Sequence, residues 1–71
     1  MYRIEHIRRS WKWTQRDLAR AVQIPQYHIS DFENGKVWPT PDQLVRLGEV
    51  LHLLPEQVME EVPVPQPQAV A

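Results

Sequence analysis

The chain has 71 residues, of which 42% are hydrophobic, with a formal net charge of −1 and no cysteine. A chain of this length supports one domain with a small core, and without cysteine it forms no disulfide or thiolate metal site. It contains no apolar stretch long enough for a signal peptide or a membrane-spanning helix, so we expect a soluble, cytoplasmic protein without membrane association.

The charges are separated along the sequence. Residues 1–20 have a net charge of +4, and residues 41–71 have a net charge of −4. The overall charge argues against nucleic-acid binding, but such a dipole can orient a protein on a phosphate backbone. The alternative is an ordinary solvated surface on which charges cluster by chance.

A first helix is predicted over about residues 2–11. Ile4, Ile7 and Trp11 recur at helical spacing, and Trp13 follows them. We expect these apolar side chains to be core anchors that pack on the segment that comes next.

A second helix is predicted to begin at Thr14. Asp17 stands three positions later, and this pair has the spacing of a capping box, which satisfies free N–H groups at a helix start. An apolar face then follows at helical spacing: Leu18, Ala19 and Val22. Gln23 takes the turn position after this helix, where we expect a left-handed or distorted backbone at some cost in strain.

A third helix is predicted with Pro25 at its first position, where the missing N–H costs nothing, and with Asn34-Gly35 at its end. Ile29 and Phe32 face inward on a helical wheel. The opposite arc is polar and carries little charge: Gln26, Tyr27, Ser30, Asp31 and Asn34. Such side chains suit base edges, because Gln bonds adenine, a carboxylate accepts from cytosine and a Tyr ring contacts a thymine methyl. An ordinary polar surface helix is the alternative, and the preceding helix and tight turn favour DNA recognition.

The rest of the chain predicts two further helices and a tail. Thr40 begins a fourth helix that ends near His52, a residue that tolerates the left-handed cap conformation. Residues 55–59 are predicted to form a short fifth helix. Prolines alternate after Glu61, which favours an extended conformation. We therefore expect a domain over residues 1–60 and a Pro-rich, disordered tail over residues 61–71.

Several short motifs at fixed offsets resemble the helix-turn-helix domain of the Cro and lambda-repressor family, also called the xenobiotic-response-element family. The matching motifs are Thr14-Gln15, Leu18-Ala19, Ile29-Ser30, Glu33-Asn34-Gly35-Lys36 and Pro39. The resemblance covers about residues 2–59 and implies an all-α, five-helix Cro/lambda-repressor-like helix-turn-helix domain.

The resemblance also implies roles for individual residues. Gln15 would bind a phosphate and brace the start of the third helix, the recognition helix. The complete set of expected DNA-binding residues is Gln15, Gln26, Tyr27, Ser30, Asp31, Asn34 and Lys36. Gln26, Tyr27 and Asp31 would face base edges, and Asn34 and Lys36 would hold backbone phosphates. Arg8 and Glu33 match positions that form a partly buried ion pair in several relatives, so we interpret this pair as structural.

The chain departs from the family pattern at three places. Gln23 replaces the usual glycine of the turn, and Asp31 stands where many relatives carry a basic or amide residue. Val37-Trp38 replaces the additional basic residues that relatives use on phosphates. These departures bear on DNA affinity more than on the fold.

The sequence does not favour catalysis or metal binding. His6, His28 and His52 lie far apart and lack the spacing of a zinc site, and there is no glycine-rich phosphate loop. So small a core leaves little room for a substrate pocket. We expect no catalytic residues, no cofactor and no metal.

Two classes of function remain. The favoured class is a sequence-specific transcriptional regulator, a repressor that binds a palindromic operator as a homodimer. It would be a phage-type repressor, a restriction-modification controller or an antitoxin with a toxin protein as partner. The alternative is an interaction module that has lost DNA binding. We expect the homodimer surface in the fifth helix and around these residues: Leu53, Leu54, Val58 and Val62.

Overall fold

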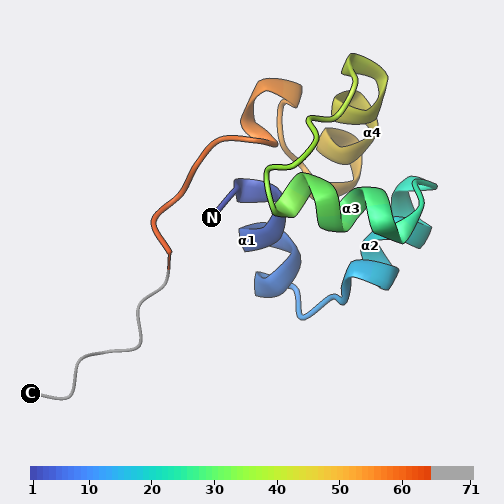
Figure 1. The fold of residues 1–71 in the computed structure, drawn as a ribbon. Helices are drawn as coiled ribbons and strands as arrows, with labels where there is room; N and C mark the ends of the chain where they lie inside the picture. The colour runs from blue at the N-terminus through green and yellow to red at the C-terminus, as the bar shows by residue number, and fades with distance from the viewer. Residues whose placement is uncertain (65–71) are drawn as a thin grey trace, which may run out of the picture.

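The structure, a computed structural model, describes residues 1–64 and is all-helical. Its elements are α1 (Arg3–Ser10), α2 (Gln15–Val22), α3 (Gln26–Glu33), α4 (Pro41–Leu51) and a 3-10 turn, η1 (Pro55–Gln57). Figure 1 shows α2 and α3 next to each other, with α4 above them and the N-terminus beside the segment that follows η1. The predicted all-α fold is confirmed, although the fifth helix is a single 3-10 turn.

No helix of the described chain is long and apolar enough to cross a membrane. The expected tail begins inside the described residues, where Glu61 forms an isolated antiparallel bridge with Tyr2. Residues 65–71, the larger part of that tail, lie outside the residues that the structure describes.

Capping boxes begin two of the helices, and the box at Thr14 is predicted from the sequence. At α2, the Asp17 amide donates to Thr14 Oγ1 over 3.0 Å and the Thr14 amide donates to Asp17 Oδ2 over 2.8 Å. Thr40 and Gln43 make the same two bonds at α4. These bonds satisfy N–H groups that have no partner within the helix.

Left-handed residues end α2 and α4. Gln23 and His52 both have φ near 58°, so the conformations expected for them are confirmed. Pro25 is displaced by one position from its predicted place, because it is the N-cap of α3 and not its first helical residue. Its backbone is extended, and its carbonyl accepts hydrogen bonds from the amides of His28 and Ile29, which open the helix.

A single core joins all the helices. Its fully or nearly fully buried apolar side chains are Ile4, Leu18, Ala19, Val22, Ile24, Ile29, Phe32, Leu47, Leu51, Val58 and Met59. Ile7, Trp13 and Leu44 are half-buried against it. The helical stripes predicted from residue spacing therefore converge on one apolar centre.

Two predicted placements are wrong. Val58, expected on a dimer surface, has 0% exposure and belongs to the core, because η1 folds it back under α4. Trp11, expected as a core anchor, is 38% exposed. It follows the last residue of α1, so its ring lies at the surface, where it contacts the rings of Trp13 and His52 edge-on.

The two ends of the described chain form a terminal clasp, residues 1–4 paired with residues 58–62. The amides of Arg3 and Ile4 donate to the carbonyls of Glu60 and Val58 over 2.7 and 2.9 Å. The Arg3 side chain also pairs with the Glu60 carboxylate. No side chain caps α1, so these carbonyls from the far end of the domain supply acceptors for its first N–H groups.

The capping box at α2 predicts a pH dependence of stability. The pKa of the Asp17 carboxyl is lowered, chiefly because it accepts a hydrogen bond from the Thr14 backbone amide. The hydrogen bond with the Thr14 side chain lowers this pKa further. A carboxyl whose pKa is lowered by folding stabilises the protein above its ordinary pKa, and this contribution disappears as the pH falls through the folded value. We therefore expect Asp17→Asn to lower the free energy of unfolding at pH 7, and we expect this loss to shrink as the pH falls from 3.8 and to vanish below the folded pKa.

Urea unfolding at pH 7 and at a pH below the folded pKa of Asp17 measures this difference. Asp42→Asn is the matched control, because Asp42 is an exposed first-turn carboxylate of α4 outside the capping box. An equal loss of stability for Asp17→Asn at both pH values would contradict the prediction.

Candidate nucleic-acid interface

Helices α2 and α3 are joined by a tight turn at residues 23–25. The left-handed backbone of Gln23 reverses the chain, and its amide donates to the carbonyl of Ala19. Ile24 is 4% exposed and anchors the turn in the core. Its backbone amide also donates a hydrogen bond to the Ala19 carbonyl. The turn is thus fixed by backbone bonds and by one buried side chain, and Gln23 adopts it without the usual glycine.

The polar arc of α3 lies on the outside of the domain. Tyr27 is 66% exposed, Gln26 and Asn34 are also exposed, and Ser30 and Asp31 are half-buried. The opposite face is buried through Ile29 and Phe32. The division of α3 into two faces agrees with the helical wheel, whereas the DNA-binding roles of these side chains stay predictions.

Two of the outward side chains already have partners on α3. The side-chain nitrogen Nδ2 of Asn34 donates to the Ser30 carbonyl over 2.9 Å and lies 3.4 Å from the Ser30 hydroxyl oxygen. The Tyr27 ring lies against His28, with 4.3 Å between ring centroids, and His28 stacks on Phe32. Both ends of the outward face are therefore ordered by contacts within the helix.

A buried ion pair holds α3 against α1. Arg8 Nε lies 2.6 Å from Glu33 Oε2 and Arg8 Nη2 lies 2.9 Å from Glu33 Oε1, so the carboxylate is bound at both oxygens. The third guanidinium nitrogen donates to the carbonyl of Trp13 over 2.7 Å. The bond to Glu33 raises the pKa of Arg8, and both residues are only 7% exposed. The pair is structural, as the resemblance to the Cro and lambda-repressor family implied.

Gln15 joins this arrangement from α2. Its amide nitrogen donates to Glu33 Oε1 over 3.1 Å. Glu33 is the last residue of α3, so Gln15 braces the end of this helix, whereas the resemblance implied that it braces the start. The position of Gln15 is decided by the buried carboxylate, which the linear motif does not reveal.

Lys36 lies in the loop directly after α3 and is exposed. Its amide donates to the carbonyl of Asp31 over 2.9 Å, which ties the start of the loop to the helix. Gly35 between them has φ of 71°, and a Cβ atom there would lie 3.0 Å from the hydroxyl oxygen of Tyr2. The positive φ favours glycine at this position, and the Tyr2 ring would have to shift by a few tenths of an ångström to admit a Cβ atom.

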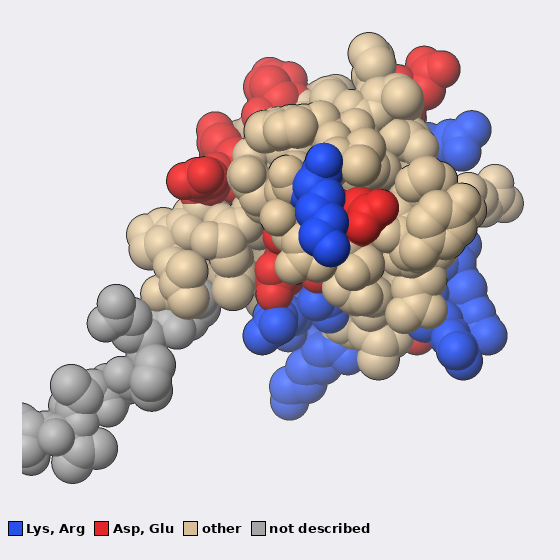
Figure 2. Space-filling model, viewed as in Figure 1, with Lys and Arg blue, Asp and Glu red and all other residues tan. Residues whose placement is uncertain are grey.

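Figure 2, viewed with α3 towards the reader, shows how charge is distributed on this side. Basic side chains gather along the lower margin, over α1 and α2, and acidic side chains gather at the upper left, over the segment after α4. The middle of this face is mostly uncharged, but a basic side chain and neighbouring acidic side chains stand out near its centre. The charge separation seen along the sequence is therefore also a separation in space.

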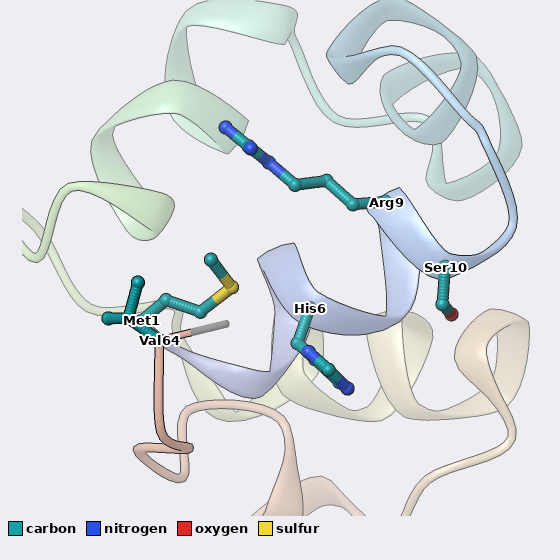
Figure 3. Close-up of a pocket in the computed structure, with 5 residues that line it drawn as sticks. All are labelled: Met1, His6, Arg9, Ser10 and Val64. Carbon is teal, nitrogen blue, oxygen red and sulfur yellow. The ribbon is translucent and has the colours of Figure 1, made fainter. Parts of the chain in front are cut away.

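A pocket of about 360 Å³ opens beside α1, lined by Met1, His6, Arg9, Ser10 and Val64. Figure 3 shows that its polar side chains project in different directions. Within residues 1–64 no group of three His, Cys, Asp or Glu side chains is placed to hold a metal ion. The α3 face, with its ordered polar side chains, is the stronger candidate for binding.

Comparisons with known proteins agree with this geometry. The helix-turn-helix family model matches residues 4–58. The HTH-type transcriptional regulator DicA of Escherichia coli strain K12 is 37% identical over 57 residues, which cover 80% of this chain and 42% of that protein. The chain thus spans about two fifths of the length of this relative. No solved structure gives a significant match.

Removing one charge of the buried pair should be more costly than removing both. Glu33→Gln leaves the Arg8 guanidinium buried without its counter-charge, so we expect a loss of about 3–5 kcal/mol in the free energy of unfolding. The matched control is the double variant Arg8→Met with Glu33→Leu, which leaves no buried charge and should unfold close to the native value. Urea unfolding compares the three proteins. A double variant as unstable as Glu33→Gln would show that the unpaired charge is not the cause.

Proposed function

Because the chain belongs to the helix-turn-helix family of the Cro and lambda-repressor type, we propose that it is a sequence-specific, DNA-binding transcriptional regulator. The observation that carries the proposal is the outward polar face of α3, held in one orientation by the buried pair of Arg8 and Glu33. The similarity to a named transcriptional regulator supports it. Regulation by DNA binding requires no catalytic step, so no enzymatic activity is part of the proposal.

In this proposal α3 enters the major groove and reads base edges. Gln26 and Tyr27 occupy its first turn, the part of a recognition helix that contacts bases in helix-turn-helix proteins. Ser30 and Asp31 follow one turn later on the same arc. Gln26 bonds adenine through two atoms, Tyr27 contacts a thymine methyl and Asp31 accepts from a cytosine amino group.

Backbone phosphates are held at the edges of this face. The side-chain amide of Gln15 donates one N–H to the Glu33 carboxylate, and its second N–H can donate to a phosphate oxygen. Asn34 and Lys36 follow this same end of α3, where Lys36 supplies a positive charge. The basic margin of α1 and α2 steers the domain towards DNA, because opposite charges attract over about a Debye length.

A homodimer on a palindromic operator is the form of regulator that we propose. One recognition helix reads few base pairs, and pairing places two such helices in successive major grooves roughly 34 Å apart. Leu54 is 58% exposed and Leu53 and Val62 are half-buried, so these residues remain candidates for the dimer surface after the exclusion of Val58. Such a cytoplasmic dimer would repress by occluding polymerase, as a phage-type repressor, a restriction-modification controller or an antitoxin.

A second candidate function is a protein-interaction module that has lost DNA binding. It is favoured by Asp31, a carboxylate half-buried on the reading face, and by Lys36, the one Lys or Arg between residues 26 and 38. A carboxylate in the groove is repelled by phosphates unless it accepts a hydrogen bond from a base. Asp31 therefore separates the two candidates.

Base reading and phosphate binding predict different losses. Gln26→Ala should cost about 1–3 kcal/mol on the preferred site and relax selectivity at one base pair. Lys36→Ala should weaken binding to all sequences alike and reduce the slope of log affinity against log salt by about one unit. Affinity for cognate and scrambled duplexes at several salt concentrations measures both effects. An equal, sequence-independent loss from both variants would exclude Gln26 as a base reader.

Selection from random duplexes tests the class of function through Asp31. Under the regulator proposal the native protein enriches a defined site, and Asp31→Ala binds that site with lower selectivity because a base contact is lost. The interaction-module candidate predicts no enriched sequence from the native protein and general DNA affinity in Asp31→Arg. No enrichment with native protein, together with recovery of a protein partner from the same cells, would overturn the regulator proposal.

A further inference from the structure

The loop between α3 and α4 exposes two apolar side chains next to the proposed DNA-binding face. Val37 is 47% exposed and Trp38 is 59% exposed, and they directly follow Lys36. The next residue, Pro39, is buried and anchors the end of this segment. Two features carry the inference: an exposed indole and an exposed cationic residue that precedes it by two positions in the same loop.

The Trp38 ring is held in place by a chain of contacts. It meets the ring of Tyr2 edge-on, with 5.7 Å between the ring centroids. Tyr2 lies over Gly35, close enough that a Cβ atom there would be 3.0 Å from the Tyr2 hydroxyl oxygen. Tyr2 itself is fixed by its antiparallel bridge with Glu61 in the terminal clasp. A ring held in this way loses little conformational entropy when another surface covers it.

The loop also lies on the same side of the molecule as the recognition helix. Figure 1 shows it leaving the end of α3 and passing towards α4 on the near side, in front of the other helices. The Lys36 amide is bonded to the carbonyl of Asp31, so the loop starts against α3 itself. A duplex that contacts the outward face of α3 therefore passes this loop.

We propose that Val37 and Trp38 form an uncharged contact with the sugar rings of the DNA backbone, beside the phosphate that Lys36 binds. This inference rests on the proposed DNA-binding function and adds a binding element to it. Deoxyribose is the part of the backbone that presents carbon-bound hydrogens, so an indole face can bury apolar area against it without displacing a cation. The contact supplies affinity where the loop has no basic residue beyond Lys36.

Binding through an uncharged contact has a distinct salt dependence. Loss of a phosphate-binding cation reduces the salt slope, because fewer counterions are released, whereas loss of an apolar contact leaves it unchanged. We expect Trp38→Ala to weaken binding to a mixed-sequence duplex about ten-fold, because the variant buries on the order of 60 Å² less apolar area against the DNA. The salt slope should remain at its native value, and the loss should be the same for any sequence.

Trp11→Ala is the matched control. Trp11 is also partly exposed, but it lies against Trp13 and His52 and not beside α3. We expect this variant to bind the same duplex with native affinity. Thermal unfolding of each variant shows that both remain folded under the conditions of the binding measurement.

Fluorescence provides a readout that does not remove the side chain. In the variant Trp11→Phe with Trp13→Phe, Trp38 is the one tryptophan left of the three in the chain. Addition of the mixed-sequence duplex should change its emission and protect it from quenching by acrylamide. Sedimentation of the same samples without DNA reports whether Trp38 is covered by a second copy of the chain.

Four outcomes would overturn the inference. Native affinity of Trp38→Ala, with unchanged Trp38 fluorescence on DNA addition, would exclude the contact and leave the regulator proposal intact. A loss confined to certain sequences would mean that the indole reads bases, and acrylamide protection before DNA is added, with altered sedimentation of Trp38→Ala, would assign it to a protein interface. No DNA binding by the native protein, to mixed or selected duplexes, would overturn the inference and the proposed function together.

Discussion

A buried ion pair decides the direction in which α3 faces. Arg8 and Glu33 lie far apart in the sequence. The Arg8 guanidinium donates to the Glu33 carboxylate and to the Trp13 carbonyl, and the Gln15 side-chain amide also donates to the Glu33 carboxylate. Charges removed from water are tolerated only when such bonds replace their hydration. Within the described chain no buried side-chain nitrogen or oxygen lacks a partner. Few orientations of α3 satisfy all of these bonds, so the pair also fixes the outward face.

Attraction to DNA and recognition of its sequence are separated in this domain. Most of the basic side chains lie over α1 and α2, whereas α3 contributes no Lys or Arg to its outward face. In the function that we propose, long-range attraction comes from the basic margin, and selectivity comes from polar groups that bond bases at short range. A net charge of −1 is compatible with this arrangement, because five of the nine acidic residues follow residue 40 and acidic side chains gather at the upper left of Figure 2, away from the basic lower margin.

The ends of the domain take part in positioning this face. Carbonyl groups of Val58 and Glu60 accept from the first amides of α1, the helix that carries Arg8. Tyr2, in the same clasp, covers Gly35 and contacts Trp38 at the start of the loop after α3. The segment after α4 is therefore a structural support of the α3 region, and it buries Val58 as part of the core.

The sequence by itself determined the features that depend on neighbouring residues. The capping box of Thr14 and Asp17 and the left-handed Gln23 follow from contacts within a few residues. The two faces of α3 follow from the helical spacing of its apolar residues, and the family motifs located the helix-turn-helix. The tertiary structure decided features that need distant partners. Gln15 meets the end of α3 across 18 residues, and Arg3 meets Glu60 across 57. Local patterns carry no record of such contacts, because burial and pairing depend on how the complete chain packs.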